Sequence, residues 1–530
     1  MPNTTIHHKK NGTTYLYKIE KSYWDKNKKQ PRNKQTCIGK IDPKTGNITP
    51  TTTRKNNTQQ QTTTNPQITA TTKTHGPNQL LTKITNQLNL TEMLKQSFPN
   101  NHQEILSLAY FITQKGHALS RCEQWSQNHT HPHNQPITSQ RISELLKEIT
   151  HDKRQHFLSQ WLNHLIEKEY LCYDITSVSS YATSNEYVYW GYNRDHEKLP
   201  QINLAMLFGQ KSRLPAYYRR MPGNISDVVT LKNTIDTLDF LGQSKLQLVL
   251  DQGFYSKNNV DALFKKQYQF ILMVPIGRVW VRDIIDQYYE SIASPVNYRQ
   301  TISEDGGGEE VLYMVSHPYK WGEEKDGGCE CFVHLFYNAS RAALDFDGLT
   351  KRLVCCKEEL ESGKRIKEHE ELYERFFIVE QSSLGGLLVF YNEDAIAKFR
   401  NRYAGFFCLL TNNVALDSLE VLEVYRRKEV VECCFDDLKN SLDMKRLRVH
   451  SSLAMDGRLF VQFLALILLS QIRVVAKNSE TLRHLSAREI MEAMESVVQI
   501  TYSEKYGSTI SETGPLQRTI IDAFNIPQKT

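Results

Sequence analysis

The sequence predicts an α/β fold in which a mixed sheet is flanked by helices and interrupted by an inserted domain. Between residues 170 and 276, apolar segments of strand length alternate with two segments of helical period. Similar segments return after residue 405, and the stretch between them has a different composition, with charged and glycine-rich parts. The chain has 530 residues, more than one hydrophobic core usually serves, so the sheet is expected to share the chain with further domains.

Residues 1–48 are expected to form a small basic unit rich in β-hairpins. Residues 1–50 hold eleven Lys and Arg against three acids, an excess that suits a polyanion partner, although a solvated basic tail has the same composition. The aromatic residues are predicted to close a small core rather than stack on bases: Tyr15, Tyr17, Tyr23 and Trp24. Residues 49–78 consist mainly of Thr, Asn and Gln and predict a flexible linker.

Residues 79–168 have helical periodicity and are interpreted as the mainly helical DNA-binding region. Thr138 or Ser139 can cap a helix that begins with polar Gln140 and Arg141, which is how a DNA-reading helix starts. A short surface helix with the same cap has the same pattern, so both interpretations stay open.

The first part of the core spans residues 169–276. A meander of strands is predicted in LCYDITSVSSYA, EYVYWGY, QINLAMLFG and LPAYYRRM. A helix over 227–240 leads to the strand LQLVLD, and a helix over 258–266 precedes the strand FILMVPI. This β-β-β-α-β-α order is the pattern of a ribonuclease-H-like core.

Residues 277–405 are interpreted as a β-rich insertion domain, because they hold the short strands EVLYMVSH and CFVHLFYN beside a charged helical run. The second part of the core, residues 406–480, contains the strand FFCLLTNN and an apolar helix over 459–475. The apolar run 459–469 is too short for a bilayer and contains Gln462, so a buried helix and no membrane partner are predicted. Residues 481–530 are expected to form a C-terminal helical segment and tail.

The ten cysteines include no C-x-x-C pair and no matching Cys/His cluster. They are interpreted as reduced thiols of a cytoplasmic protein, not as a disulfide frame or a zinc site. The N-terminus begins polar and basic without an apolar h-region, so no secretory signal is expected.

The stretch Tyr425–Lys439, YRRKEVVECCFDDLK, carries the clearest chemical pattern. If it is helical, then Tyr425, Lys428, Glu432 and Lys439 fall on one narrow stripe. Because burying such charges without partners costs several kcal/mol, the stripe is not a core seam. It indicates a surface that holds phosphates and a metal ion, or else a solvated face with i,i+4 ion pairs.

Two further acids lie where acids are unusual. Asp174 stands in the middle of a predicted strand. Its role is either that of a metal ligand held on a rigid element or that of a structural ion-pair partner. Asp251 ends the apolar strand LQLVLD, and carboxyl ends of central strands present chemistry in α/β sheets; an N-cap or Asx turn is the alternative role.

Asp174, Asp251 and Glu432 together would repel unless cations lie between them, and carboxylate oxygens suit Mg²⁺, with Mn²⁺ as a substitute. Two such ions can activate a hydroxyl on one side of a phosphodiester and stabilise the leaving oxygen on the other. The expected chemistry is phosphodiester cleavage and strand transfer.

On these residues the chain resembles insertion-sequence DDE transposases of the group with the YREK signature, Y-x2-R-x3-E-x6-K. Tyr425, Lys428, Glu432 and Lys439 match its spacing, and RLRVHSS follows at Arg446. YDITSVSS, GYNRDHEKLPQINLAMLF, MPGNISD and LDQGFYS are also similar, so the resemblance covers roughly residues 10–480. Lys428 stands where the signature has Arg, which keeps the charge and loses the bidentate fork.

The resemblance implies that Asp174, Asp251 and Glu432 bind the catalytic metals. It implies DNA contacts for five side chains: Tyr425, Lys428, Lys439, Arg446 and Arg448. The partner would be double-stranded DNA, both the terminal inverted repeats and the target, bound by a homodimer in a prokaryotic cytoplasm at the nucleoid. Cut-and-paste transposition through a hairpin intermediate, with the insertion lying over the active site, is the implied reaction.

Alternatives remain open from the residues themselves. Glu429, Asp436 and Asp437 are near neighbours of Glu432, and Asp436 would share its helical face. A ribonuclease-H-like nuclease without joining activity would have the same carboxylates. A catalytically decayed DNA-binding repressor is a further alternative.

Overall fold

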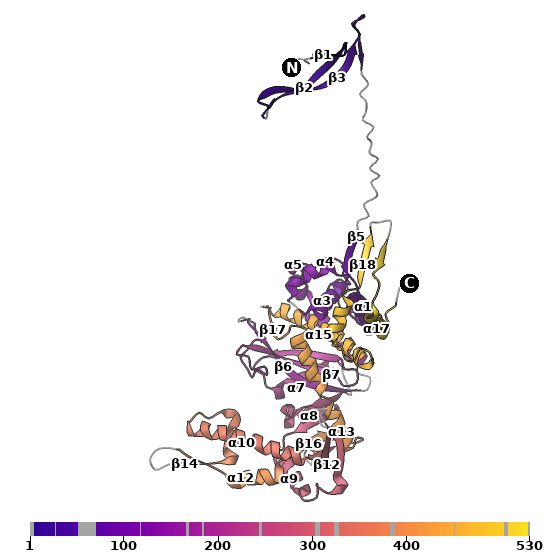
Figure 1. Ribbon diagram of the computed structural model, residues 1–530. Coiled ribbons are helices and arrows are strands. Elements are labelled where there is room, and N and C mark those ends of the chain that lie inside the picture. The colour runs from indigo at the N-terminus through magenta and orange to yellow at the C-terminus, as the bar shows by residue number, and fades with distance from the viewer. Residues whose placement is uncertain are drawn as a thin grey trace. The chain divides into compact units, whose positions relative to one another are not determined.

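The computed structural model describes residues 5–26, 28–50, 70–116, 118–165, 169–182, 185–242, 246–302, 308–322, 328–381, 387–449, 451–502 and 507–527. The chain divides into two compact units, residues 1–70 with 502–506, and residues 71–501 with 507–530. Helices and strands carry the labels of Figure 1.

The N-terminal unit is a four-stranded antiparallel sheet in the order β1-β2-β3-β4. Its strands are β1 (Thr5–Lys10), β2 (Thr13–Asp25), β3 (Gln30–Ile41) and β4 (Ile48–Pro50). Asn11 and Gly12 join β1 to β2 with positive φ at both residues, the combination that a two-residue hairpin turn requires. Tyr23 and Trp24 are 48% and 62% exposed, so the prediction that they close a core is wrong.

The helical part of the second unit begins earlier than the sequence suggested. Its N-terminal helices are α1 (Gly76–Gln87), α2 (Leu90–Ser97), α3 (His102–Lys115), α4 (Cys122–Asn128), α5 (Ser139–Glu148) and α6 (His151–Leu165). The C-terminal helices are α16 (Ala487–Met494) and α17 (Pro515–Ala523), and a sheet β19-β18-β5 joins Ser508–Ile510, Val498–Tyr502 and Ala70–Thr74. The proposed linker is therefore too long at its C-terminal end, and its residues 51–69 lie outside the described residues.

The main sheet has the strand order β11-β12-β13-β16-β10-β9-β6-β7-β8. Its strands are β6 (Tyr170–Ser180), β7 (Gln201–Gly209), β8 (Pro215–Pro222), β9 (Gln247–Leu250), β10 (Gln269–Val274), β11 (Tyr298–Ile302), β12 (Glu309–Trp321), β13 (Cys329–Tyr337) and β16 (Phe406–Thr411). β6, β7 and β8 form an antiparallel meander, and β9 and β10 run parallel to β6. The short strand β17 (Arg446–Leu447) pairs with the end of β6.

Three helices follow strands of this sheet: α7 (Asp227–Phe240) and α8 (Lys257–Lys265), as the apolar periodicity predicted, and α9 (Val279–Tyr288), which was not predicted. The segment EYVYWGY is not a strand, since 185–192 forms turns with one isolated bridge at Tyr189. Trp190 and Tyr192 are 68% and 75% exposed there. Alternating aromatic residues therefore marked an exposed loop rather than a half-buried strand.

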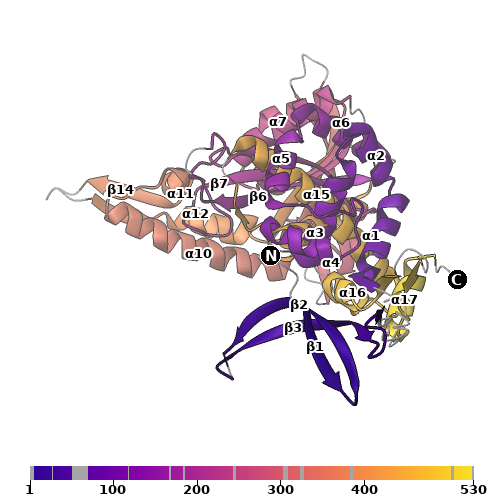
Figure 2. The ribbon, with the colours of Figure 1, turned by 90° about the horizontal axis from the view of Figure 1, so that it is seen from above.

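The predicted β-rich insertion domain is incorrect in two ways. Strands β11 to β13 belong to the main sheet, because β13 pairs with β16 from Phe332 to Tyr337. The remaining segment is mainly helical, with α10 (Ala339–Glu361), α11 (Glu370–Phe376), hairpin β14–β15 (Phe377–Gln381, Leu387–Tyr391) and α12 (Glu393–Lys398). It has a small hydrophobic core of its own, separate from the main core. Figure 2 shows α10 and β14 extending away from the sheet.

Helix α15 (Ser452–Asn478) is the apolar helix that the sequence predicted, extended at both ends. The Ser451 hydroxyl accepts a hydrogen bond from the Ala454 N–H and caps its first turn. α15 packs against α3, α5 and β8 and so joins the helical part to the sheet (Figure 1). By length and composition it could cross a membrane, yet 83% of its most apolar window is buried inside the fold.

Candidate active site

Asp174 and Asp251 are brought together by the register of two parallel strands. The pairing of β6 with β9 ends at Tyr173 and Leu250, so the two aspartates come next on neighbouring strands. Both side chains are partly buried, and the Asp174 carboxylate accepts a hydrogen bond of 2.7 Å from the Ile175 N–H. The structure therefore places Asp174, in the middle of β6, beside Asp251, which follows the last residue of β9.

The YREK-like stretch is not one continuous helix. α13 (Ser418–Arg426) ends before Lys428, and α14 (Glu429–Asp436) is followed by a π turn, Asp437–Ser441. At the break the Lys428 N–H bonds to Tyr425 O and the Val431 N–H to Lys428 O, three-residue spacings that tighten the backbone. The single stripe predicted from a regular helix is therefore wrong, because the tightened turn rotates the residues before it relative to those after it.

Tyr425 and Lys428 both reach Asp251. The Tyr425 hydroxyl donates a hydrogen bond of 2.8 Å to Asp251 Oδ1, and the Lys428 ammonium lies 3.3 Å from the same oxygen. Lys428 also lies over the Tyr425 ring, 4.9 Å from its centroid. Tyr425 is only 2% exposed, so its ring cannot stack on a DNA base; it positions Asp251 instead.

The two aspartates have opposite pKa shifts. Burial raises the pKa of Asp174 to about 6, against the Ile175 N–H bond and Arg194, and the neighbouring charge of Asp251 adds to the rise. Burial also opposes ionisation of Asp251, but Lys428 and the Tyr425 hydroxyl outweigh it and lower its pKa. Such a pair, with pKa values driven apart by the surroundings, is typical of functional sites.

Glu432 lies on α14, one turn beyond Lys428, and its side chain is exposed. Within the described residues it has neither an ion pair nor a hydrogen bond. Asp174, Asp251 and Glu432 do not bring one carboxylate oxygen each within 4.8 Å of one another; among the described residues, the group of possible ligands that meets this distance lies elsewhere. The structure thus joins the two aspartates and leaves Glu432 on the adjoining helix.

The three other acids near Glu432 differ in how deeply their side chains are buried. Glu429 and Asp436 are exposed on α14, whereas Asp437 is 2% exposed and paired with Arg473. Burial raises the pKa of Asp437 to about 6 against the attraction of Arg473. Asp437 is therefore a buried structural acid.

A loop between β6 and β7 binds two of the cations that were expected to contact DNA. Lys439 Nζ lies 2.7 Å from Asp195 Oδ1, and both side chains are largely buried. Arg446 bonds to Glu197 at 2.8 Å and to the Tyr181 hydroxyl at 2.8 Å. Acids of the GYNRDHEKLP segment thus neutralise both cations. The sequence resemblance had included this segment without assigning it any contact.

We predict that Lys439→Met lowers the free energy of unfolding by about 1–3 kcal/mol, because it leaves the Asp195 carboxylate partly buried without its partner. Chemical denaturation measures this. The double variant Lys439→Met/Asp195→Asn is expected to recover part of the loss. Lys257→Met removes the exposed pair with Asp261 and serves as a control with little effect. Equal losses in Lys439→Met and the control would contradict the structural role.

The predicted DNA-reading helix is present, but its arginine is bound within the protein. Thr138 caps α5 by accepting a hydrogen bond from the Arg141 N–H. The Arg141 guanidinium forms ion pairs with Glu104 and Glu148. The cap was predictable from the sequence, and the structure favours a packed helix over a base-reading one.

One group of possible metal ligands was missed by the sequence analysis. Cys356, Glu359 and His369 place one ligand atom each within 4.8 Å of one another in the α10–α11 unit. The spacing of Cys356 and Glu359 by three residues on a helix was the available signal. Glu359 already bonds His369 at 2.8 Å and the Tyr373 hydroxyl, so the contacts are satisfied within the protein.

The fold and these side chains define the class. The sheet brings Asp174 and Asp251 onto adjacent strands, and a tyrosine and a lysine contact Asp251. Residues 167–468 match the family model described as the transposase DDE domain. The chain therefore belongs to the DDE transposase family, enzymes that cleave DNA and generally use divalent metal ions.

Two further comparisons complete the picture. No curated protein matches the chain. Among solved structures, the chain is similar to a piggyBac transposase in a cryo-EM synaptic complex with hairpin DNA, at 9% identity and a TM-score of 0.33. The match covers 79% of this chain and 76% of that one.

Proposed function

We propose that the protein is an insertion-sequence transposase of the YREK-signature group. It binds the terminal inverted repeats of its element and catalyses metal-dependent phosphodiester cleavage and strand transfer, by cut-and-paste through a hairpin intermediate. The observation that carries the proposal is the pairing of Asp174 with Asp251, with Tyr425 and Lys428 fixed on Asp251. The family match gives the reaction class.

The catalytic core is proposed to be ribonuclease-H-like. The order β8-β7-β6-β9-β10, with three antiparallel strands followed by two parallel ones, supports this proposal. This strand order brings the two aspartates together, since Asp174 lies in β6 and Asp251 directly follows the adjacent strand β9. The extra strands β16 and β13 to β11 extend the sheet on the far side of β10.

Divalent cations fit the donor set. Oxygen ligands from Asp174 and Asp251 suit Mg²⁺ or Mn²⁺, and because burial raises the pKa of Asp174 to about 6, a bound cation would favour its ionised form. Glu432 is proposed as the third ligand. Bound ions would polarise the phosphodiester and stabilise the leaving oxygen. The chain's own part is to keep Asp251 ionised and oriented through Lys428 and Tyr425.

The remaining parts of the proposal concern DNA and assembly. The basic N-terminal sheet and the helical region would contact the inverted repeats, and a homodimer would pair two transposon ends at the nucleoid in the cytoplasm. Tyr425 is buried, so a base displaced near the cut would need another aromatic surface. The exposed Trp190 and Tyr192, next to the loop that carries Asp195, offer one.

The test is cleavage of a labelled duplex that carries the element's own end, with Mg²⁺, with Mn²⁺ and with EDTA. Metal-dependent nicking followed by a hairpin or joined product is expected from the wild type and not from Glu432→Ala. Glu429→Ala, an exposed glutamate at the start of the same helix, is the matched control and should keep activity. Cutting without joining would favour the nuclease, and binding without cutting would favour the decayed repressor.

A further inference from the structure

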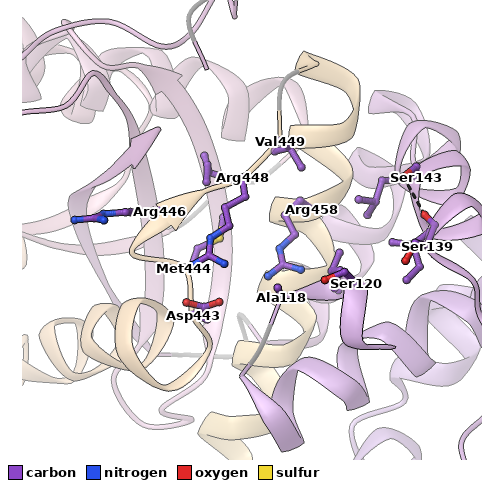
Figure 3. Close-up of a pocket in the computed structure, with 14 residues that line it drawn as sticks. Ala118, Ser120, Ser139, Ser143, Asp443, Met444, Arg446, Arg448, Val449 and Arg458 are labelled. Carbon is purple, nitrogen blue, oxygen red and sulfur yellow. Dashed lines mark hydrogen bonds between the residues drawn. The ribbon is translucent and has the colours of Figure 1, made fainter. Parts of the chain in front are cut away.

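A cavity of about 410 Å³ lies apart from the carboxylate pair, between the helical region and the core. Its walls come from α5, from the segment after α3, from residues 443–449 and from Arg458 of α15. Figure 3 shows Arg448 and Arg458, from two different elements, extending into it with the Asp443 carboxylate below them. The family resemblance assigned Arg448 to DNA in general and did not include this cavity or Arg458.

Arg458 is a buried cation of α15. It is 8% exposed, and among the described residues it has no ion pair and no hydrogen bond. Burial lowers its pKa to about 10, and the like charge of Arg448 works in the same direction while Asp443 opposes both. A buried guanidinium is normally paired, because an unpaired charge is costly to remove from water.

Arg448 adds a second positive charge to the same cavity. Its side chain is exposed and, in the described part of the chain, it has no ion pair. Arg446 on the same segment is different, since Glu197 and Tyr181 hold it and Figure 3 shows it turned away. Two guanidinium groups thus face one carboxylate, Asp443, and the cavity keeps an excess of positive charge.

The other wall offers neutral donors. Ser120 and Ser139 line it with hydroxyl groups, whereas the Ser143 hydroxyl already donates a hydrogen bond to Ser139 O within α5. Hydroxyls and arginine forks are donors from which phosphate oxygens accept hydrogen bonds.

The walls are fixed by two close approaches of backbone. A Cβ at Gly457 would lie 2.1 Å from Leu146 O, so only glycine lets α15 approach α5 beside Arg458. A Cβ at Gly116 would lie 2.4 Å from Ser441 O, which ties the segment after α3 to the turn before Asp443. The cavity is therefore built into the packing of the fold.

We propose that this pocket binds one phosphate of the DNA backbone between the forks of Arg448 and Arg458. The inference rests on the proposed transposase function and adds a site to it. β17, which precedes Arg448, pairs with β6 at Ser179, five residues beyond Asp174 and so roughly 17 Å along the strand.

The salt dependence of end binding tests the proposal. Arg448→Ala and Arg458→Met should each reduce the slope of log affinity against log salt by about 0.9, the value for one phosphate contact. The factor by which raising the salt from 50 to 200 mM weakens binding would then be about three- to four-fold smaller in each variant than in the wild type. Arg488→Ala removes an exposed arginine of α16, paired with Glu492, and should leave the slope unchanged. Met replaces a buried charge with an apolar chain of similar length, so the fold is expected to persist.

A second arm uses inorganic phosphate without DNA. Phosphate should raise the melting temperature of the wild type and not that of Arg458→Met. A reduced salt slope in both variants, together with no rise in the melting temperature of Arg458→Met on adding phosphate, supports the proposed phosphate site. If neither variant changes the salt slope, the pocket does not bind the DNA backbone. If, in addition, inorganic phosphate raises the melting temperature of the wild type and not that of Arg458→Met, the pocket binds a free anion instead. These results do not depend on cleavage, so a protein that binds ends and never cuts them would refute the transposase reaction and leave the pocket standing.

Discussion

Asp251→Asn is expected to abolish cleavage of the transposon end while leaving end binding within about two-fold of the wild type. Asn has the same shape and lacks the charge that holds a divalent cation. Loss of an outer partner of a metal ligand typically costs 10–100-fold, so loss of the ligand itself should cost about 1000-fold or more. Single-turnover cleavage and a filter-binding isotherm on the same labelled duplex measure the two quantities.

Tyr425→Phe is the matched variant for this prediction. It removes the hydroxyl that donates 2.8 Å to Asp251 and keeps the buried ring. A positioning residue should lower the cleavage rate by about 10–100-fold and shift its pH dependence upward, because Asp251 loses one of the groups that lower its pKa. If Asp251→Asn instead loses DNA binding and melts at a lower temperature, Asp251 has a structural role.

Local patterns in the sequence were sufficient for the core strands and the aspartate pair. The apolar period and the turn residues gave β6 to β10 and α7, and Asp251 stood out because an acid ends an apolar strand. A parallel register then follows from the crossover helix between neighbouring strands. These features depend on residues that are close in sequence.

The rest of the site depends on contacts between distant residues. Tyr425 bonds to Asp251 across 174 residues, and Lys439 bonds to Asp195 across 244. A regular helical wheel does not predict the break in the helix at Lys428. The strands β11 to β13 were assigned to a separate domain because the pairing of β13 with β16, which joins them to the main sheet, also spans a long stretch of chain.

Arg458 shows where a sequence signal existed and was not used. It stands in an apolar helix, directly before LFVQFLALILL, where a charged residue without a function is unusual. The other walls of its cavity come from the segment 443–449 and from α5, which no local pattern connects. A charge inside an otherwise apolar helix is therefore evidence for a site before its other walls are known.

Asp174→Asn is expected to stabilise the metal-free protein at pH 7.5 by up to about 3 kcal/mol while it abolishes cleavage. The folded pKa is about 6 and the ordinary value 3.8, a difference of about 2 units at 1.36 kcal/mol each. Because the folded state favours the protonated acid, the wild type loses stability as pH rises from about 4 to 6, and the whole loss persists above pH 6. Asn has no charge to desolvate, and its carbonyl can still accept the Ile175 N–H bond.

Chemical denaturation at pH 4.5 and 7.5, in EDTA, gives the difference between Asp174→Asn and the wild type. It should be small at pH 4.5 and large at pH 7.5, whereas Asp195→Asn, which breaks the pair with Lys439, should destabilise at both. Mg²⁺ at pH 7.5 should then stabilise the wild type and not the variant, because a bound cation supplies the positive charge that Asp174 lacks. An Asp174→Asn protein less stable than the wild type at pH 7.5 would mean that the carboxylate is held by a structural ion pair. Removing the Asp174 charge is thus expected to stabilise the protein and to abolish cleavage. Removing an acid with a structural role would instead destabilise the protein.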